Sequence, residues 1–182
     1  MYDSCAVFLP TLTSQQYRKI ELDVGLVITR IIHIIAGSFW MGSAIYLAVL
    51  LEPRIRATSG DLERQLMNKT SKLNSLWITS AAVVTMLSGF ALVSTTPGRS
   101  MSDIGSGSWG TMILIGIMTS VTAFLVSGAA GAFTAKLRRG LESSEADEDE
   151  LAMYRSKLTL LGYLNAILVV IAVSTMATAR YA

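Results

Sequence analysis

The chain has 182 residues, of which 52% are hydrophobic and only 15% are charged. A soluble domain carries about a quarter charged residues, so a sizeable soluble catalytic domain is excluded. The net charge of +2 gives no reason to expect a nucleic acid as a partner. The single cysteine, Cys5, excludes a disulfide scaffold.

Long apolar runs separate most of the charged residues. Four of these runs are long enough for a helix that crosses about 30 Å of hydrocarbon, which takes about 20 residues. They cover residues 24–51, 76–95, 109–135 and 158–179. The sequence therefore predicts an all-α integral membrane four-helix bundle, a single membrane domain over residues 1–182 with the lipid bilayer as its environment.

The basic residues predict the orientation of this bundle. The connectors 52–75 and 136–157 lie on the same side of a four-span protein, and they hold ten of its 15 Lys and Arg residues. By the positive-inside rule these two connectors are cytoplasmic. We therefore predict a multi-pass protein of the cell membrane with both termini outside.

Two shorter segments flank the first span. Residues 1–23 contain an apolar stretch too short for a signal peptide, which predicts an outer or interfacial segment. In the first connector, Leu62, Leu66 and Leu73 recur at near-helical spacing among charged residues, and Asp61 can cap a helix there. This pattern predicts a short cytoplasmic amphipathic helix between spans one and two.

Arg30 and His33 are ionisable residues inside the first span, three residues apart and so on one face of a helix. An ionisable group within a bilayer is costly, which makes it a candidate functional residue. Arg30 can extend to the headgroups, whereas the shorter imidazole of His33 cannot. His33 is either a core residue hydrogen-bonded to a hydroxyl or a backbone carbonyl, or a ligand to haem iron or copper.

A second metal ligand would come from another helix at the same depth. Counting about nine residues inward from the outer face, at the rise of an α-helix, reaches His33, Met86 and Met118 on three different spans. Met pairs with His at haem and copper sites, although most of the nine Met residues are expected to be core filler. With one His, two imidazole ligands would require two copies or a partner subunit.

Small residues cluster in the first span and again in the third. They lie at 36–38 and 42–44, and at 127–132. Small residues let helix backbones approach closely in lipid, so these clusters predict packing surfaces of the bundle. They also leave room for a flat ligand.

The first span carries a longer pattern from residue 33 to residue 47. It reads HIIAGSFWMGSAIYL, with a His, a Trp seven residues on, a small pair nearby and a Tyr six residues beyond the Trp. This pattern resembles the membrane-domain superfamily of copper-resistance protein D and of the HemJ-type oxygen-independent protoporphyrinogen oxidases. The likeness continues more weakly through Glu63-Arg64, through 87–89 and at Trp109.

The resemblance implies a cofactor site. In such oxidases the matching His ligates a b-type haem, which implies that role for His33. Met86 or Met118 would then supply the sixth ligand. The remaining residues implied at the site are Arg30, which would pair with a propionate, and Trp40 and Tyr46, which would line the pocket.

One departure separates this chain from those oxidases. Ile113 occupies the position of their third-span Lys, and their further His residues have no counterpart here. An oxidase of tetrapyrroles needs proton acceptors near the ring. The resemblance therefore supports the fold and haem binding more strongly than it supports oxidoreductase activity.

Three functions remain open. The first is haem b binding through His33, in electron transfer or haem handling. The second is copper handling by His33 and Met residues, as in the copper-resistance relatives. The third is a non-catalytic small subunit of a larger membrane complex or homo-oligomer, in which Gly37, Gly42, Gly128 and Gly131 make helix contacts.

Overall fold

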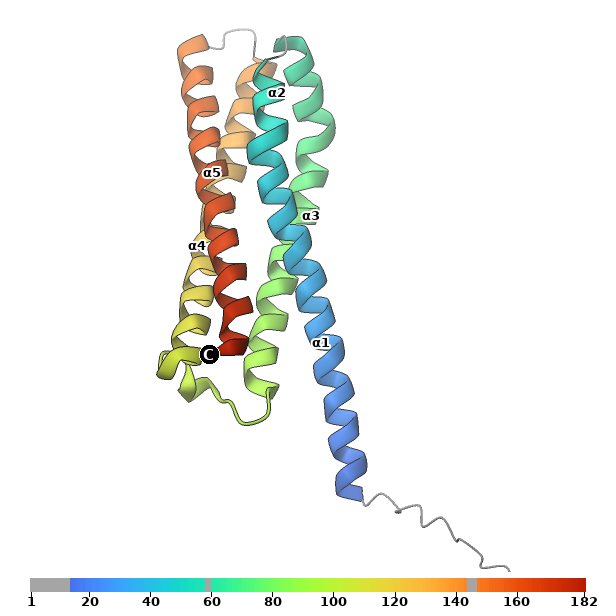
Figure 1. Cartoon of the computed structure of the whole chain (residues 1–182). Coiled ribbons are helices and arrows are strands. Elements are labelled where there is room, and N and C mark those ends of the chain that lie inside the picture. The colour runs from blue at the N-terminus through green and yellow to red at the C-terminus, as the bar shows by residue number, and fades with distance from the viewer. Residues whose placement is uncertain (1–13, 58–59, 144–146) are drawn as a thin grey trace, which may run out of the picture.

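A computed structural model describes residues 14–57, 60–143 and 147–182. This part of the chain is helical and contains no strand, which confirms the predicted all-α bundle (Figure 1). The helices are α1 (Ser14–Ile45), α2 (Glu52–Arg56), α3 (Gly60–Thr95), α4 (Gly107–Glu142) and α5 (Glu148–Thr178). A π-helical turn covers Tyr46–Leu51, and short 3-10 turns cover Met101–Asp103 and Ala179–Tyr181.

Four helices of the described chain are long and apolar enough to cross a membrane. They are Val24–Ile55, Leu73–Thr95, Gly107–Glu142 and Glu148–Tyr181. Each contains one of the four predicted spans. Large apolar side chains such as Ile35, Leu87 and Leu160 are exposed on their outer faces, as lipid contact allows. The architecture fits a multi-pass membrane protein.

The first membrane helix changes its winding near Pro53. Proline has no backbone N–H and cannot continue the hydrogen-bond pattern of an α-helix. The chain responds with the wider π-helical turn Tyr46–Leu51 immediately before α2, where Pro53 occupies the first turn. The winding changes while the chain stays helical, so this membrane segment continues to Ile55.

The predicted surface helix between the first two spans is not a separate element. Helix α3 runs without a break from Gly60 to Thr95 and joins that segment directly to the second span. No proline or glycine interrupts residues 61–76, so nothing stops the helix from propagating. The side chains of Asp61, Leu62 and Leu66 lie outside the described part of the chain.

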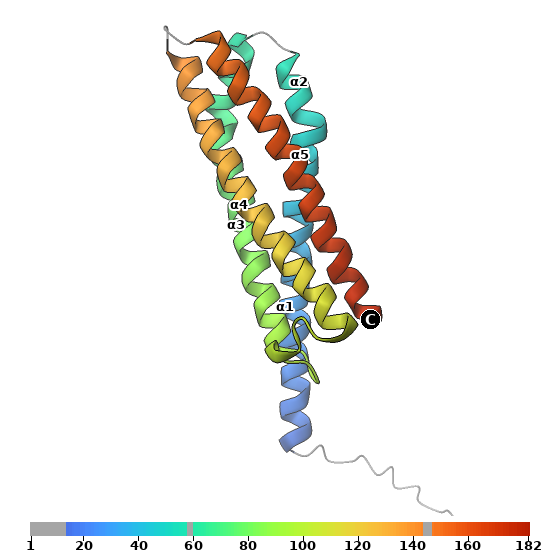
Figure 2. The ribbon, with the colours of Figure 1, turned by 90° about the vertical axis from the view of Figure 1, so that its left-hand side faces the viewer.

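The membrane helices associate as two main pairs. Helix α1 packs along α3 and α4 packs along α5, while smaller contacts join α1 to α5 and α3 to α4. Helices α1 and α4 are therefore diagonal neighbours across the bundle, as the two views in Figures 1 and 2 agree. The first turns of α1 extend beyond the other helices (Figure 1).

A single large side chain fills the centre of the bundle. Trp40 of α1 is 1% exposed and belongs to a buried cluster with Ala44, Ala82, Ala123 and Val169. This cluster draws on all four membrane helices. Because the alanines are small, the four helices can approach one another around the indole ring.

The predicted glycine contacts are only partly present. A Cβ at Gly37 would lie 3.4 Å from Cγ2 of Thr85, so α1 approaches α3 closely there. A Cβ at Gly42, Gly128 or Gly131 would meet nothing within 4 Å in the described chain. These three glycines are therefore not close-contact points between the helices described.

A charged pair joins α3 to α5 at the α2 end of the bundle. The Arg155 guanidinium donates to both carboxylate oxygens of Glu63, from Nε at 3.1 Å and from Nη2 at 2.7 Å. The Glu63 side chain is only 7% exposed, whereas Glu148, which lies 3.7 Å from Arg155, is 84% exposed. The bidentate pair joins two helices through residues that are 92 positions apart in sequence.

We predict that Glu63→Gln destabilises the bundle by about 2 kcal/mol, because it removes a charge-assisted bond at a buried site. Thermal unfolding in detergent, followed by the helical circular dichroism signal, measures this. Glu148→Gln is the matched control and should change little, because that carboxylate is exposed. Equal losses in both variants would contradict the assignment.

Gly110 should be intolerant of any side chain. A Cβ there would lie 1.9 Å from the backbone carbonyl oxygen of Asp103, and a backbone atom cannot rotate away. We expect Gly110→Ala to lower stability by about 2 kcal/mol or more. Gly131→Ala in the same helix should be neutral in the same unfolding assay, because its Cβ would enter open space.

Candidate functional site

His33 joins α1 to α3 through a backbone hydrogen bond. Its Nδ1 lies 2.8 Å from the carbonyl oxygen of Thr85 and 3.2 Å from Oγ of Ser88. A carbonyl oxygen only accepts hydrogen bonds, so Nδ1 carries the proton. The Ser88 hydroxyl donates to the Val84 carbonyl oxygen at 2.6 Å and can accept from Nδ1. The tautomer of His33 is therefore fixed by its surroundings.

Gly89 makes room for this imidazole on α3. A Cβ at Gly89 would lie 3.0 Å from Cε1 of His33 and 3.4 Å from Nδ1. Without a side chain at this position, the imidazole can approach the helix surface beside the Thr85 carbonyl. Gly89 is the one glycine in the predicted second span, so the sequence marks it as a position where another group could approach the helix closely. The sequence did not show that His33 is the group that approaches it.

The second ring nitrogen of His33 is unused. Among the described residues Nε2 has no hydrogen-bond partner, although the side chain is half-buried. Since Nδ1 holds the proton, Nε2 presents a lone pair. The same contact with a backbone carbonyl that satisfies a core histidine also orients a metal-binding histidine. The geometry at Nδ1 thus agrees with both hypotheses, and Nε2 is the atom that distinguishes them.

One of the two predicted methionine ligands lies away from this imidazole. Met118 is 59% exposed on α4, which is diagonal to α1. Met86 is half-buried on α3, one residue after Thr85 and three residues before Gly89. No group of three or more His, Cys, Asp and Glu residues in the described chain could hold a metal ion.

The other predicted site residues occupy three separate environments. Arg30 is exposed about one turn along α1 from His33. Trp40 is in the bundle core, where its Nε1 is buried without a partner among the described residues. Tyr46 is 51% exposed on the π-helical turn. Arg30 and His33 are near each other along one helix. Neither cavity described below is lined by all three of Arg30, Trp40 and Tyr46.

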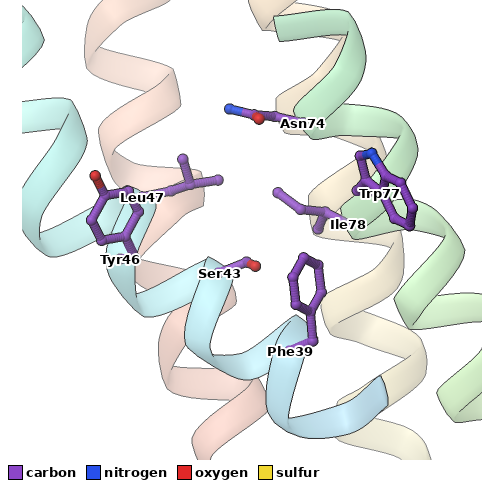
Figure 3. A pocket seen from close by; sticks show the side chains of 7 residues that line it. All are labelled: Phe39, Ser43, Tyr46, Leu47, Asn74, Trp77 and Ile78. Carbon is purple, nitrogen blue, oxygen red and sulfur yellow. The ribbon is translucent and has the colours of Figure 1, made fainter. Parts of the chain in front are cut away.

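His33 lines neither of two cavities found between the described helices. One of about 190 Å³ lies between α1 and α3, with Tyr46 in its wall (Figure 3). The other, of about 70 Å³, is lined by Trp40 and residues of α3 and α4. Cofactor pockets usually measure about 300–1,000 Å³. The donor chemistry of His33 suits haem iron, whereas neither of these two cavities has room for the macrocycle, which would have to lie on the outer flank of α1 and α3.

Comparisons with protein families, with characterised proteins and with solved structures find no match to this chain. The family resemblance in the first span is thus untested, and the roles it implies stay predictions.

We predict that Gly89→Leu displaces the His33 ring, because even a Cβ at this position is tighter than an ordinary contact. The cost should be about 1–3 kcal/mol, as for overpacking elsewhere. Thermal unfolding measures the cost, and the imidazole ¹⁵N chemical shifts report whether Nδ1 keeps its hydrogen bond. Gly42→Leu on α1 is the control, since its Cβ would meet nothing nearby. Unchanged imidazole shifts in the Gly89 variant would contradict the described packing.

Proposed function

We propose that this membrane protein binds haem b through Nε2 of His33 and serves in electron transfer or haem handling. The observation that carries the proposal is the half-satisfied imidazole. Nδ1 is held by the Thr85 carbonyl, and Nε2 has no partner among the described residues. An oriented neutral imidazole with a vacant lone pair is the form in which histidine ligates haem iron.

A purely structural role explains this arrangement less well. An unpaired polar group in an apolar environment costs free energy, and a larger apolar side chain could pack against Gly89 without that cost. The hydrogen bond to Thr85 does stabilise the α1–α3 pair. It leaves the second nitrogen unexplained, and coordination of a metal centre gives that nitrogen a partner.

Haem is favoured over copper by the number of ligands that the protein must supply. Haem iron brings four ring nitrogens of its own, so one imidazole is enough to hold it from one side. A copper ion requires several protein ligands. The described residues hold no cluster of His, Cys, Asp or Glu for it, and Met118 lies on α4, diagonal to α1.

The surroundings of His33 also suit a porphyrin on the outer flank of the bundle. Ile32 and Ile34 expose apolar surface beside it, and no membrane-facing polar group would have to be stripped of water. Arg30 is exposed about one turn away, near enough along α1 to meet a propionate. A bound haem would supply one-electron redox chemistry, while the chain would hold and orient it.

An absorption spectrum tests the proposal. Protein purified from cells grown with ample haem should show a Soret band, and dithionite should sharpen its visible bands. His33→Ala should lose at least nine-tenths of the bound haem at unchanged helical content, and added imidazole should restore part of it. Met86→Leu should shift the reduced bands through loss of the sixth ligand, and Met118→Leu on the diagonal helix α4 is the matched control.

Metal analysis of the same preparation distinguishes the alternatives. Bound copper without iron would support copper handling instead, as the resemblance to copper-resistance protein D implies. Colourless protein with neither metal would refute both metal functions. It would leave the non-catalytic membrane subunit, in which the Thr85 contact is the whole role of His33.

A further inference from the structure

The larger cavity lies on the α1–α3 flank, nearer the α2 end of the bundle than His33. Its volume is about 190 Å³. The lining residues are Phe39, Ser43, Tyr46, Leu47, Asn74, Trp77 and Ile78 (Figure 3). Asn74 is next to the first residue of the membrane segment Leu73–Thr95. The cavity therefore begins near the membrane boundary and reaches into the apolar region.

The polar side chains that line this cavity make no hydrogen bonds to other described residues. Ser43, Tyr46 and Asn74 have no hydrogen-bond partner among the described residues. Other hydroxyls in the spans donate to the carbonyl one turn earlier, as Thr85 does to Ala81 at 2.7 Å. Figure 3 shows the Asn74 amide projecting from α3 toward α1 and the Ser43 hydroxyl projecting from α1 toward α3. The Ser43 and Asn74 groups face one cavity, whereas the Tyr46 hydroxyl points away from it (Figure 3). Two unpaired polar groups that face one cavity favour a ligand with matching polar atoms.

The cavity is also open to the membrane and walled by aromatic rings. Phe39, Tyr46 and Trp77 are 49%, 51% and 61% exposed, so a ligand can enter sideways from the lipid. Aromatic side chains stack on flat rings. None of the seven lining residues is charged. A phosphate or carboxylate would have no counter-charge from the lining residues, which disfavours an anionic lipid headgroup as the occupant.

We propose that this cavity binds the head ring of a lipid-soluble quinone. One carbonyl oxygen of the ring would accept a hydrogen bond from the Asn74 amide, and the other would accept from the hydroxyl of Ser43. The volume is below the range for a whole drug-sized ligand, so the ring occupies the cavity and the isoprenoid tail remains in the lipid. This inference does not depend on the haem.

Quenching of tryptophan fluorescence by decylubiquinone in phosphatidylcholine nanodiscs tests the proposal. Quenching should saturate, and Trp77→Phe should remove most of the saturable part. Asn74→Leu should weaken binding about tenfold, the usual effect of losing one buried hydrogen bond. Ser43→Ala should weaken it several-fold. The matched controls are Asn68→Leu on α3 and Tyr163→Phe on α5, both exposed and outside the cavity.

Three results would overturn the quinone site. Quenching that rises linearly with quinone concentration would mean partition into lipid only. Wild-type affinity in Asn74→Leu would remove the hydrogen bond on which the site depends. Competition by decylbenzene as strong as by the quinone would mean that an alkyl chain occupies the cavity. Wild-type protein prepared without haem should bind the quinone normally, so the outcome is independent of the haem experiment.

Discussion

The hydrogen bond from His33 to the Thr85 carbonyl is the interaction on which the arrangement of α1 and α3 depends. Lipid gives helices no hydrophobic reason to associate, so packing and polar contacts decide which pairs form. An interhelical hydrogen bond contributes only about 0.6 kcal/mol on average in a membrane. The His33 bond is accompanied by close packing on Gly89 and Gly37, and together these contacts define one flank of the bundle. Both the unused nitrogen and the larger cavity lie on this flank.

Helices α4 and α5 form the other half of the bundle, and different contacts hold them together. Ser127 of α4 donates to Asn165 of α5 at 3.1 Å, and both residues lie in the apolar region. Met176 of α5 packs on Gly116 of α4. At the α2 end, Arg155 joins α5 to Glu63 of α3. The charged pair links the two main helix pairs where water is closest, and the neutral contacts act where charges would be too costly.

The position of Trp40 explains why any ligand would bind at the edge of this protein. The indole ring occupies the bundle centre with alanines around it, so no large central cavity remains. The available space lies between neighbouring helices and opens toward lipid. A site of this kind suits ligands that arrive from the membrane, such as a quinone or a haem, better than ligands that enter from water. A haem at His33 and a quinone in the Asn74 cavity would both arrive from the membrane, and they would contact different atoms of the protein.

The sequence by itself determined the fold class and the four spans, because the length of an apolar run is set directly by the thickness of the bilayer. It also identified His33, since an imidazole inside such a run is conspicuous. It could not identify Thr85 as a partner, because a backbone carbonyl has no sequence signature. The family resemblance implied that Trp40 and Tyr46 line one pocket, whereas Trp40 is in the core and Tyr46 lies on the flank. Helix pairing decided these points: which residues share a cavity depends on the rotation of each helix about its axis, and that rotation is set only when all four helices pack together.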